Sequence, residues 1–115
     1  MNLNTFLAKL KQNPSSISFN EAIEAIEGHY VFTPTMFKNG SITNSTGENN
    51  GSCKIIAFGL LNKLTEQQTL ACFGDYYRKD VLEHPENDDH QNIRNFIANG
   101  WDGIAFEGNA LSPKN

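Results

Sequence analysis

The sequence NNGSCKIIAFGLL, residues 49–61, holds the longest unbroken apolar run of the chain and opens on polar turn residues. Every residue from Ile55 to Leu61 is apolar or glycine, and a helix that is apolar on all sides must be covered on more than one side. Asn50 or Ser52 is a suitable N-cap, because a short side-chain oxygen accepts hydrogen bonds from the free N–H groups of a helix start. We therefore expect a central buried helix here, with the other segments packed around it.

The length and the apolar composition predict one mainly helical domain. A chain of 115 residues is long enough to bury a core but too short for two ordinary domains. Phenylalanine is abundant, with 8 residues, while valine is scarce, which favours helices over an all-β architecture. We expect a single compact domain over residues 1–115, with 112–115 as a flexible tail. It would have about five helices and at most a short β-ribbon near residues 30–42 or 101–106. An α+β fold is the alternative.

Charge and cysteine content exclude several classes of protein. The net charge is −4, and the 9 Lys and Arg residues are scattered among acids, so we expect no nucleic-acid partner. The N-terminus resembles no secretion signal and no apolar run is long enough to cross a bilayer, so we expect a soluble protein of the cytoplasm without a membrane partner. Cys53 and Cys72 would stay reduced in that compartment. No cofactor and no metal are predicted, since the acids of residues 83–90 match no ligand spacing.

Capping signals and apolar spacing predict the other helices. The segments Ser18–Glu21 and Thr65–Gln68 are capping boxes, in which the first and last side chains each satisfy a free backbone N–H. Apolar residues at helical spacing follow a possible Asn4 cap, so the fold is expected to use the chain from its first residues. Helical spacing also covers residues 75–83 and 89–100.

Extended structure is predicted only in short pieces. Asn39-Gly40 is a turn signal for a small hairpin, because both residues accept a positive φ. Ile104 and Phe106 occupy alternate positions, as in a strand, and residues 104–106 could pair with residues 30–32. The polar segment 43–52 is the longest loop, and we interpret it as a solvated connector rather than a functional loop.

Cys53 is the candidate nucleophile of the chain. It lies at a predicted helix start beside Lys54, and the helix dipole and the cation both favour the thiolate. His90 would be its general base, with Asp89 or Asp102 orienting the imidazole. The same cysteine also heads the apolar face of the central helix, where burial would raise its pKa. We therefore expect a structural Cys53 and assign no catalytic residue.

The candidate binding residues each have an ordinary structural alternative. Arg78 and Arg94 could bind an anion through a bidentate fork, or could pair with neighbouring aspartates. Tyr30 and Trp101 are large amphipathic aromatics that could line a groove or the rim of the core. Asn50 is a candidate because it opens the central helix from the polar loop.

Several short strings, taken together, are specific enough to indicate a family. They are YVFTPT at 30–35, FKNG at 37–40, GSCKI at 51–55, TLACFG at 69–74, YRKDVL at 77–82 and DHQNIRNF at 89–96. With these strings the chain resembles the HopJ type III effector family of bacteria over nearly its whole length. The resemblance implies export through a type III system and a partner that is a host or bacterial protein. It implies no catalytic residues, because no settled activity comes with the family.

Two classes of function stay open. The first is an effector or adaptor that binds another protein, and the second is a small thiol-dependent enzyme or small-ligand binder built around Cys53 and His90. We rank protein binding first. A shallow apolar groove would favour the first class, and a polar pocket at the start of the central helix, reached by Cys53, would favour the second. The sequence predicts no oligomeric state.

Overall fold

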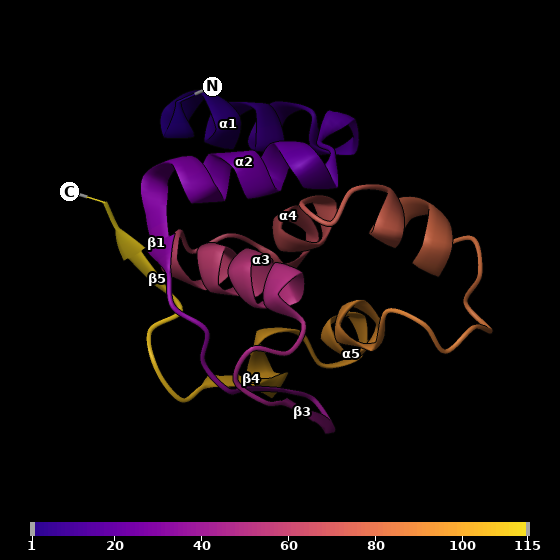
Figure 1. The fold of residues 1–115 in the computed structure, drawn as a ribbon. Coiled ribbons are helices and arrows are strands. Elements are labelled where there is room, and N and C mark those ends of the chain that lie inside the picture. Colours follow the sequence, from indigo (N-terminus) through magenta and orange to yellow (C-terminus); the bar gives the residue numbers. More distant parts are fainter. Residues whose placement is uncertain (1, 115) are drawn as a thin grey trace.

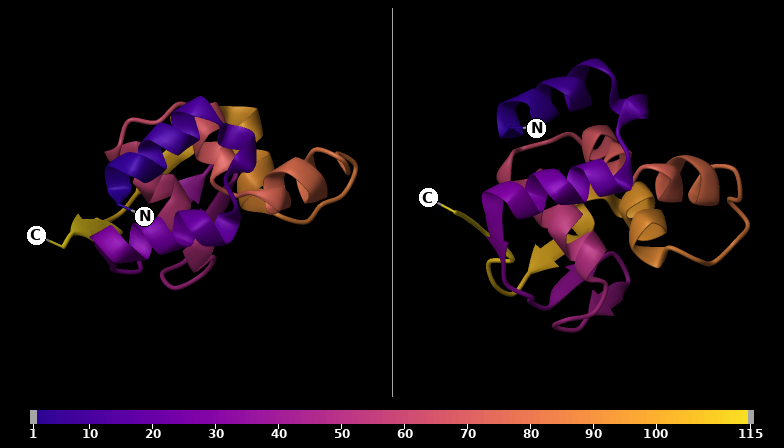
Figure 2. Two further views of the ribbon diagram at one scale, coloured as in Figure 1. Left: turned by 90° about the horizontal axis from the view of Figure 1, so that it is seen from above. Right: turned by 45° about the horizontal axis from the view of Figure 1, so that its top comes forward.

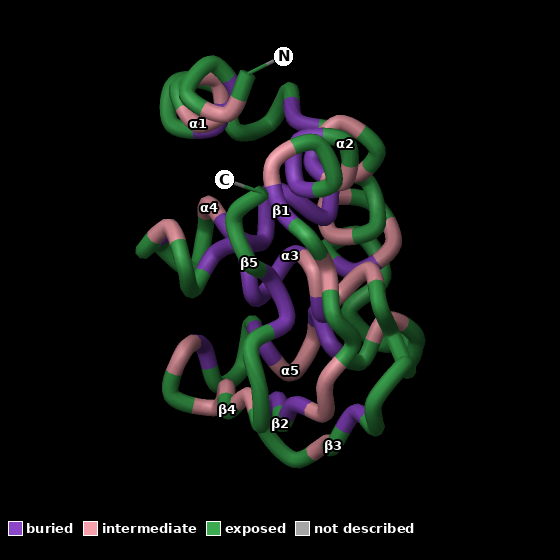
Figure 3. The backbone as a smooth tube through the Cα atoms, turned by 60° about the vertical axis from the view of Figure 1, so that its left-hand side comes forward, coloured by how far each residue is buried: buried purple, intermediate pink, exposed green. Residues whose placement is uncertain are grey.

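The computed structural model describes residues 2–114 and has helix α3 (Asn50–Leu61) at its centre (Figure 1). All residues from Ile55 to Gly59 are buried, so the predicted central buried helix is confirmed. Helix α2 (Phe19–His29) and helix α4 (Glu66–Ala71) both pack against it. In Figure 3 the buried segments gather around α3.

The remaining helices cover this centre from outside. Helix α1 (Leu3–Gln12) lies over α2 and continues into the 3-10 helix η1 (Pro14–Ser16). After α4 come the π-helical segment η2 (Tyr76–Val81), helix α5 (Gln91–Asn99) and the 3-10 helix η3 (Gly100–Gly103). Segment η2 and the loop after it project from the side of the molecule in both views of Figure 2.

The start signals read from the sequence are confirmed for two of these helices and corrected for two. Ser18 and Thr65 each form a complete capping box with the residue three positions later. Helix α1 is capped by Asn2, whose side chain accepts from the N–H of Thr5, and not by Asn4. Helices α3 and α5 follow Asn49 and His90 and have no side-chain cap.

Five short strands form two small sheets in the described part of the chain. Strand β1 (Tyr30–Phe32) pairs with β5 (Leu111–Pro113), and strand β2 (Phe37–Asn39) lies between β3 (Ile42–Asn44) and β4 (Ile104–Phe106). All pairs are antiparallel. The prediction of a mainly helical fold with at most one ribbon is therefore wrong, and the structure has the α+β arrangement.

The feature that the sequence did not predict correctly is the pairing of strands that lie far apart along the chain. The predicted hairpin is present as β2–β3, and Gly40 in its turn has φ +62°. However, β4 pairs with β2 and not with β1. Ser112 and Pro113, expected in a flexible tail, pair with Val31 and Tyr30 instead. Strands of three residues are too short to show an alternating pattern, so neither their existence nor their partners can be read from local sequence.

Gly74 makes a close backbone contact that joins the end of α4 to the start of α2. Its φ is +62°, and a Cβ at this position would lie 2.5 Å from the backbone nitrogen of Phe19. Gly28, near the end of α2, has no atom within 4 Å of such a Cβ. The two glycines therefore provide a matched pair for alanine substitution.

We predict that Gly74→Ala lowers the free energy of unfolding by about 1–3 kcal/mol, because alanine is strained at positive φ and collides with rigid backbone. Gly28→Ala should raise it by about 0.5 kcal/mol, because alanine reduces the freedom of the unfolded chain. Urea unfolding followed by circular dichroism measures both changes. A Gly74→Ala protein as stable as the parent would contradict the close contact.

Candidate functional site

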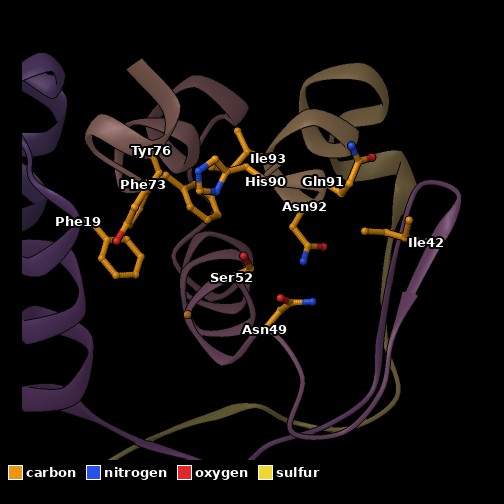
Figure 4. A pocket seen from close by; sticks show the side chains of 11 residues that line it. Phe19, Ile42, Asn49, Ser52, Phe73, Tyr76, His90, Gln91, Asn92 and Ile93 are labelled. Carbon is orange, nitrogen blue, oxygen red and sulfur yellow. The ribbon is translucent and has the colours of Figure 1, made fainter. Parts of the chain in front are cut away.

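A polar hollow lies where helices α3 and α5 begin (Figure 4). It has a volume of about 350 Å³. Its lining comes from α2, β3, α3, the segment before and within η2, and α5. We call it the polar hollow; side chains that define it include Ser52, Tyr76, His90, Gln91 and Asn92.

Both helices begin in an unusual way at this hollow. Asn49 and His90, the residues before the helices, have φ 52°, and neither side chain caps its helix. The backbone N–H groups of Gly51, Ser52, Gln91 and Asn92 have no hydrogen-bond partner within residues 2–114. Free N–H groups at a helix start, together with the helix dipole, favour an acceptor or an anion. The polar hollow therefore has the chemistry of a binding site for a small polar group.

His90 is held on one side of this hollow by a carboxylate. Its Nε2 lies 3.0 Å from Oδ2 of Asp80 and 3.9 Å from Oδ2 of Asp89. Its ring packs on Tyr76 at a centroid distance of 5.2 Å. Asp80, rather than the Asp89 or Asp102 considered from the sequence, is thus the carboxylate nearest to the imidazole. No sequence signal distinguishes Asp80, because residues 80 and 90 meet only through the fold of the intervening loop.

Cys53 is buried and does not share the polar hollow with His90. Its relative exposure is 1%, and it does not line the polar hollow, although its neighbour Ser52 does. Burial raises the pKa of the Cys53 thiol, outweighing the backbone of Thr35 and the charge of Lys54, which act in the opposite direction. Among the described residues no hydrogen bond joins Cys53 to His90. The structure therefore does not bring the proposed thiol and imidazole together as a reactive pair.

A network of asparagines, most of them buried, adjoins the polar hollow, which Asn49 and Asn92 line. The Asn92 side chain accepts from Nδ2 of Asn39 at 2.9 Å and of Asn44 at 3.0 Å. Asn92 donates in turn to Oδ1 of Asn44, which also accepts from Asn49 at 2.7 Å. These bonds join β2, β3 and the loop before α3 to α5, and buried amide networks of this kind hold one arrangement of their elements. The asparagine-rich composition of residues 43–52 is the sequence signal for Asn44 and Asn49, although it also fits the solvated connector expected from the sequence.

Arg94 fixes the loop that leads to His90. It donates to the backbone oxygens of Asp80, His84, Pro85 and Asp89, and its Nη2 lies 2.7 Å from Oδ1 of Asp89. A guanidinium presents several donors in a rigid fork, which suits this kind of clamp. In this structure Arg94 therefore pairs with a neighbouring aspartate, which is the alternative to anion binding that the sequence left open.

Arg78 is also bound to backbone rather than to an aspartate. Its Nη1 donates to the carbonyl oxygens of Pro14 and Ala71 at 3.4 Å, and its Nη2 donates to that of Ile17. It joins η2 to η1 and to the end of α4. Since carbonyl acceptors are neutral, the positive charge of Arg78 is not cancelled by these contacts.

The aromatic candidates and Asn50 lie elsewhere. Tyr30 is buried in the core, where its hydroxyl accepts from Nδ2 of Asn62 at 3.2 Å. The indole Nε1 of Trp101 donates to the carbonyl oxygen of Leu64 at 3.1 Å. Asn50 is exposed at the first position of α3 and does not line the polar hollow. None of the three belongs to the polar hollow.

A second depression, which we call the apolar hollow, lies between α1, η1, α4 and η2. It has a volume of about 300 Å³ and an almost entirely apolar surface. Leu10 and Ala71 are buried in its floor, and the rim carries Tyr77 and Leu82, the latter 52% exposed. The structure thus contains a polar pocket that Cys53 does not reach and a shallow apolar one.

No group of three or more His, Cys, Asp or Glu side chains within residues 2–114 is arranged to hold a metal ion. In the same range, no helix is long and apolar enough to cross a membrane.

The clamp by Arg94 predicts an acid-sensitive loop. The hydrogen bond from Arg94 holds the pKa of Asp89 below its ordinary value. A depressed carboxyl pKa contributes stability at higher pH that is lost as pH falls through the folded-state pKa. We therefore expect hydrogen-exchange protection near residues 80–90 to fall on acidification. An NMR titration should show the Asp89 pKa rising toward its ordinary value in Arg94→Gln.

Glu21 provides the control for that titration. Its pKa is also lowered, by a hydrogen bond from Lys9 in α1, and it lies outside the loop. Its pKa should not change in Arg94→Gln. An unchanged Asp89 pKa in this variant would contradict the assigned cause.

The burial of Cys53 predicts slow labelling by iodoacetamide in the folded protein. A thiol with a raised pKa holds little thiolate at neutral pH, and the surrounding side chains exclude the reagent. Cys72 is the internal comparison, because burial raises its pKa to about 12. Mass spectrometry of peptides after timed labelling measures both rates. Fast labelling of Cys53 that slows in His90→Ala would restore the thiol-enzyme hypothesis.

Comparison with known proteins identifies the family but gives no activity. No curated protein matches the sequence. The chain is 57% identical to VPA0580, a protein of unknown function with a crystal structure, with a TM-score of 0.98 over 99% of this chain and 95% of that chain. The family model of the HopJ type III effector protein matches residues 3–111. The chain therefore belongs to the HopJ type III effector family.

Proposed function

We propose that this protein acts as an effector or adaptor by binding another protein, with the apolar hollow as its contact surface. The observation that carries the proposal is the apolar rim, where Leu82 is 52% exposed above a floor that includes Leu10 and Ala71. Exposed apolar surface with a polar surround is typical of protein-binding sites. Membership of an effector family supports the proposal, and with it synthesis in the cytoplasm and export by a type III system to reach a host protein.

The thiol-enzyme alternative has less support. A nucleophile must reach the substrate, and the side chain of Cys53 is buried with a raised pKa. His90 has a carboxylate partner, but Ser52, the residue of α3 that carries a hydroxyl into the lining of the polar hollow, makes no hydrogen bond to His90 in the described structure. General-base catalysis requires the base to lie within hydrogen-bond distance of the proton that it removes in the substrate complex.

Binding of a small polar ligand is the second candidate function. Its supporting observation is the meeting of two uncapped helix starts at the polar hollow, together with His90. Asp80 and Asp89 lie close to the same imidazole, and their negative charges would repel an anionic ligand. This candidate is therefore ranked below protein binding.

The proposal can be tested with a random-peptide library displayed on phage and selected on the folded protein. We predict that the selected peptides carry large apolar anchors and bind Leu82→Ala about tenfold more weakly, because a large part of the apolar contact is lost. Fluorescence anisotropy with synthetic copies of the peptides measures the affinities.

Leu61→Ala is the matched control. Leu61 is exposed to the same degree as Leu82, at 51%, but lies at the end of α3 and outside the apolar hollow. Its substitution should leave the affinities unchanged. Peptides that bind Leu82→Ala as tightly as the parent would overturn the proposal, and loss of binding in His90→Ala alone would favour the polar hollow.

A further inference from the structure

The apolar hollow has a charge opposite to that of the whole chain. Among the described residues that line it, the charged side chains are Lys11 and Arg78, both positive. The chain as a whole has a net charge of −4. The hollow is thus a local basic site on an acidic protein.

Neither cation is neutralised by a carboxylate within residues 2–114. The ion pairs of that part of the chain involve other cations, for example Lys9 with Glu21 and Arg94 with Asp89. The guanidinium of Arg78 donates to neutral backbone oxygens. Lys11 lies in the last turn of α1, where the helix dipole offsets a small part of its charge. A carboxylate on a bound partner could therefore pair with Lys11 or Arg78 without displacing a carboxylate of this chain.

The elements around the hollow indicate the shape of the partner. They are the helices α1 and α4 and the helical segments η1 and η2, and no strand of the described chain lines the hollow. Among the described residues the hollow therefore has no strand edge with which a strand of a partner could pair. A groove between helices suits an amphipathic helix that inserts apolar side chains at a spacing of three or four residues.

We propose that the apolar hollow binds a short amphipathic helix of a partner protein whose apolar anchors are flanked by Asp or Glu. This inference rests on the proposed function and names the class of partner. The apolar anchors would pack on Tyr77 and Leu82 at the rim, above the buried Leu10 and Ala71, and the flanking carboxylates would face Lys11 and Arg78. Charge complementarity of this kind chiefly sets partner choice and association rate.

The test uses three synthetic helical peptides that share one apolar face and differ in their flanking residues. One carries Glu, one Gln and one Lys at the flanks. The Glu peptide should bind the parent protein about fivefold more tightly than the Gln peptide, and the Lys peptide should bind most weakly. The differences should shrink at high ionic strength, because salt screens exposed charges.

A charge reversal on the protein makes the test specific. In Lys11→Glu the affinity for the Glu peptide should fall about fivefold and that for the Lys peptide should rise by a similar factor. Lys38→Glu is the control, since Lys38 is exposed on β2, has no ion pair in the described chain and lies away from the hollow. It makes the same change in net charge and should leave the ranking of the peptides unchanged.

Each outcome separates this inference from the proposed function. If the three peptides bind equally and all weaken in Leu82→Ala, the acidic partner is overturned while protein binding at the hollow stands. If neither these peptides nor the selected library peptides respond to Leu82→Ala, the proposed function fails as well. If sedimentation of the protein alone shows a dimer that Leu82→Ala abolishes, the occupant is a second copy and the inference is overturned.

Discussion

The requirement to cover α3 organises this structure. Its buried segment Ile55–Gly59 has no polar side chain, so every side of it must be packed against something. Phe58 shows how this is done, because the rings of Phe6 and Tyr30 each meet it edge-on at 6.0 Å. At Gly59 the absence of a side chain lets Thr69 and Trp101 approach the helix backbone. Elements far apart in the sequence are thus held together by one helix.

Local signals in the sequence predicted most of the helices because the causes of a helix are local. A capping box such as that at Ser18 involves residues three positions apart, and an apolar stripe needs only a few turns. The strands were not predicted correctly because their stabilisation comes from distant partners, as with β1 and β5, which lie far apart along the chain. A three-residue strand has little propensity of its own, and its pairing is decided by the packing of the helices around it.

The same distinction applies to the candidate site. The sequence indicated that His90 opens a helix next to acids, but the contact with Asp80 depends on the path of a loop that Arg94 clamps. The asparagines around Asn92 were visible as composition, yet their network exists only because β2, β3 and α5 meet. Of the candidate residues named from the sequence, only His90 lines the polar hollow, and its partner Asp80 was not among the candidates.

Burial also explains why we expect the thiol of Cys53 to be unreactive and directs attention to the exposed side chains of the apolar hollow. The contacts that make Cys53 a good core residue remove water from its thiol and raise its pKa, so the central helix offers no accessible thiol. A single exposed leucine is ordinary on a protein surface. Leu82 differs because it stands beside a concave apolar floor and near Lys11 and Arg78, two cations without acidic partners in the described chain. Folding alone does not require that combination, and it is therefore the observation that supports the proposed contact with another protein.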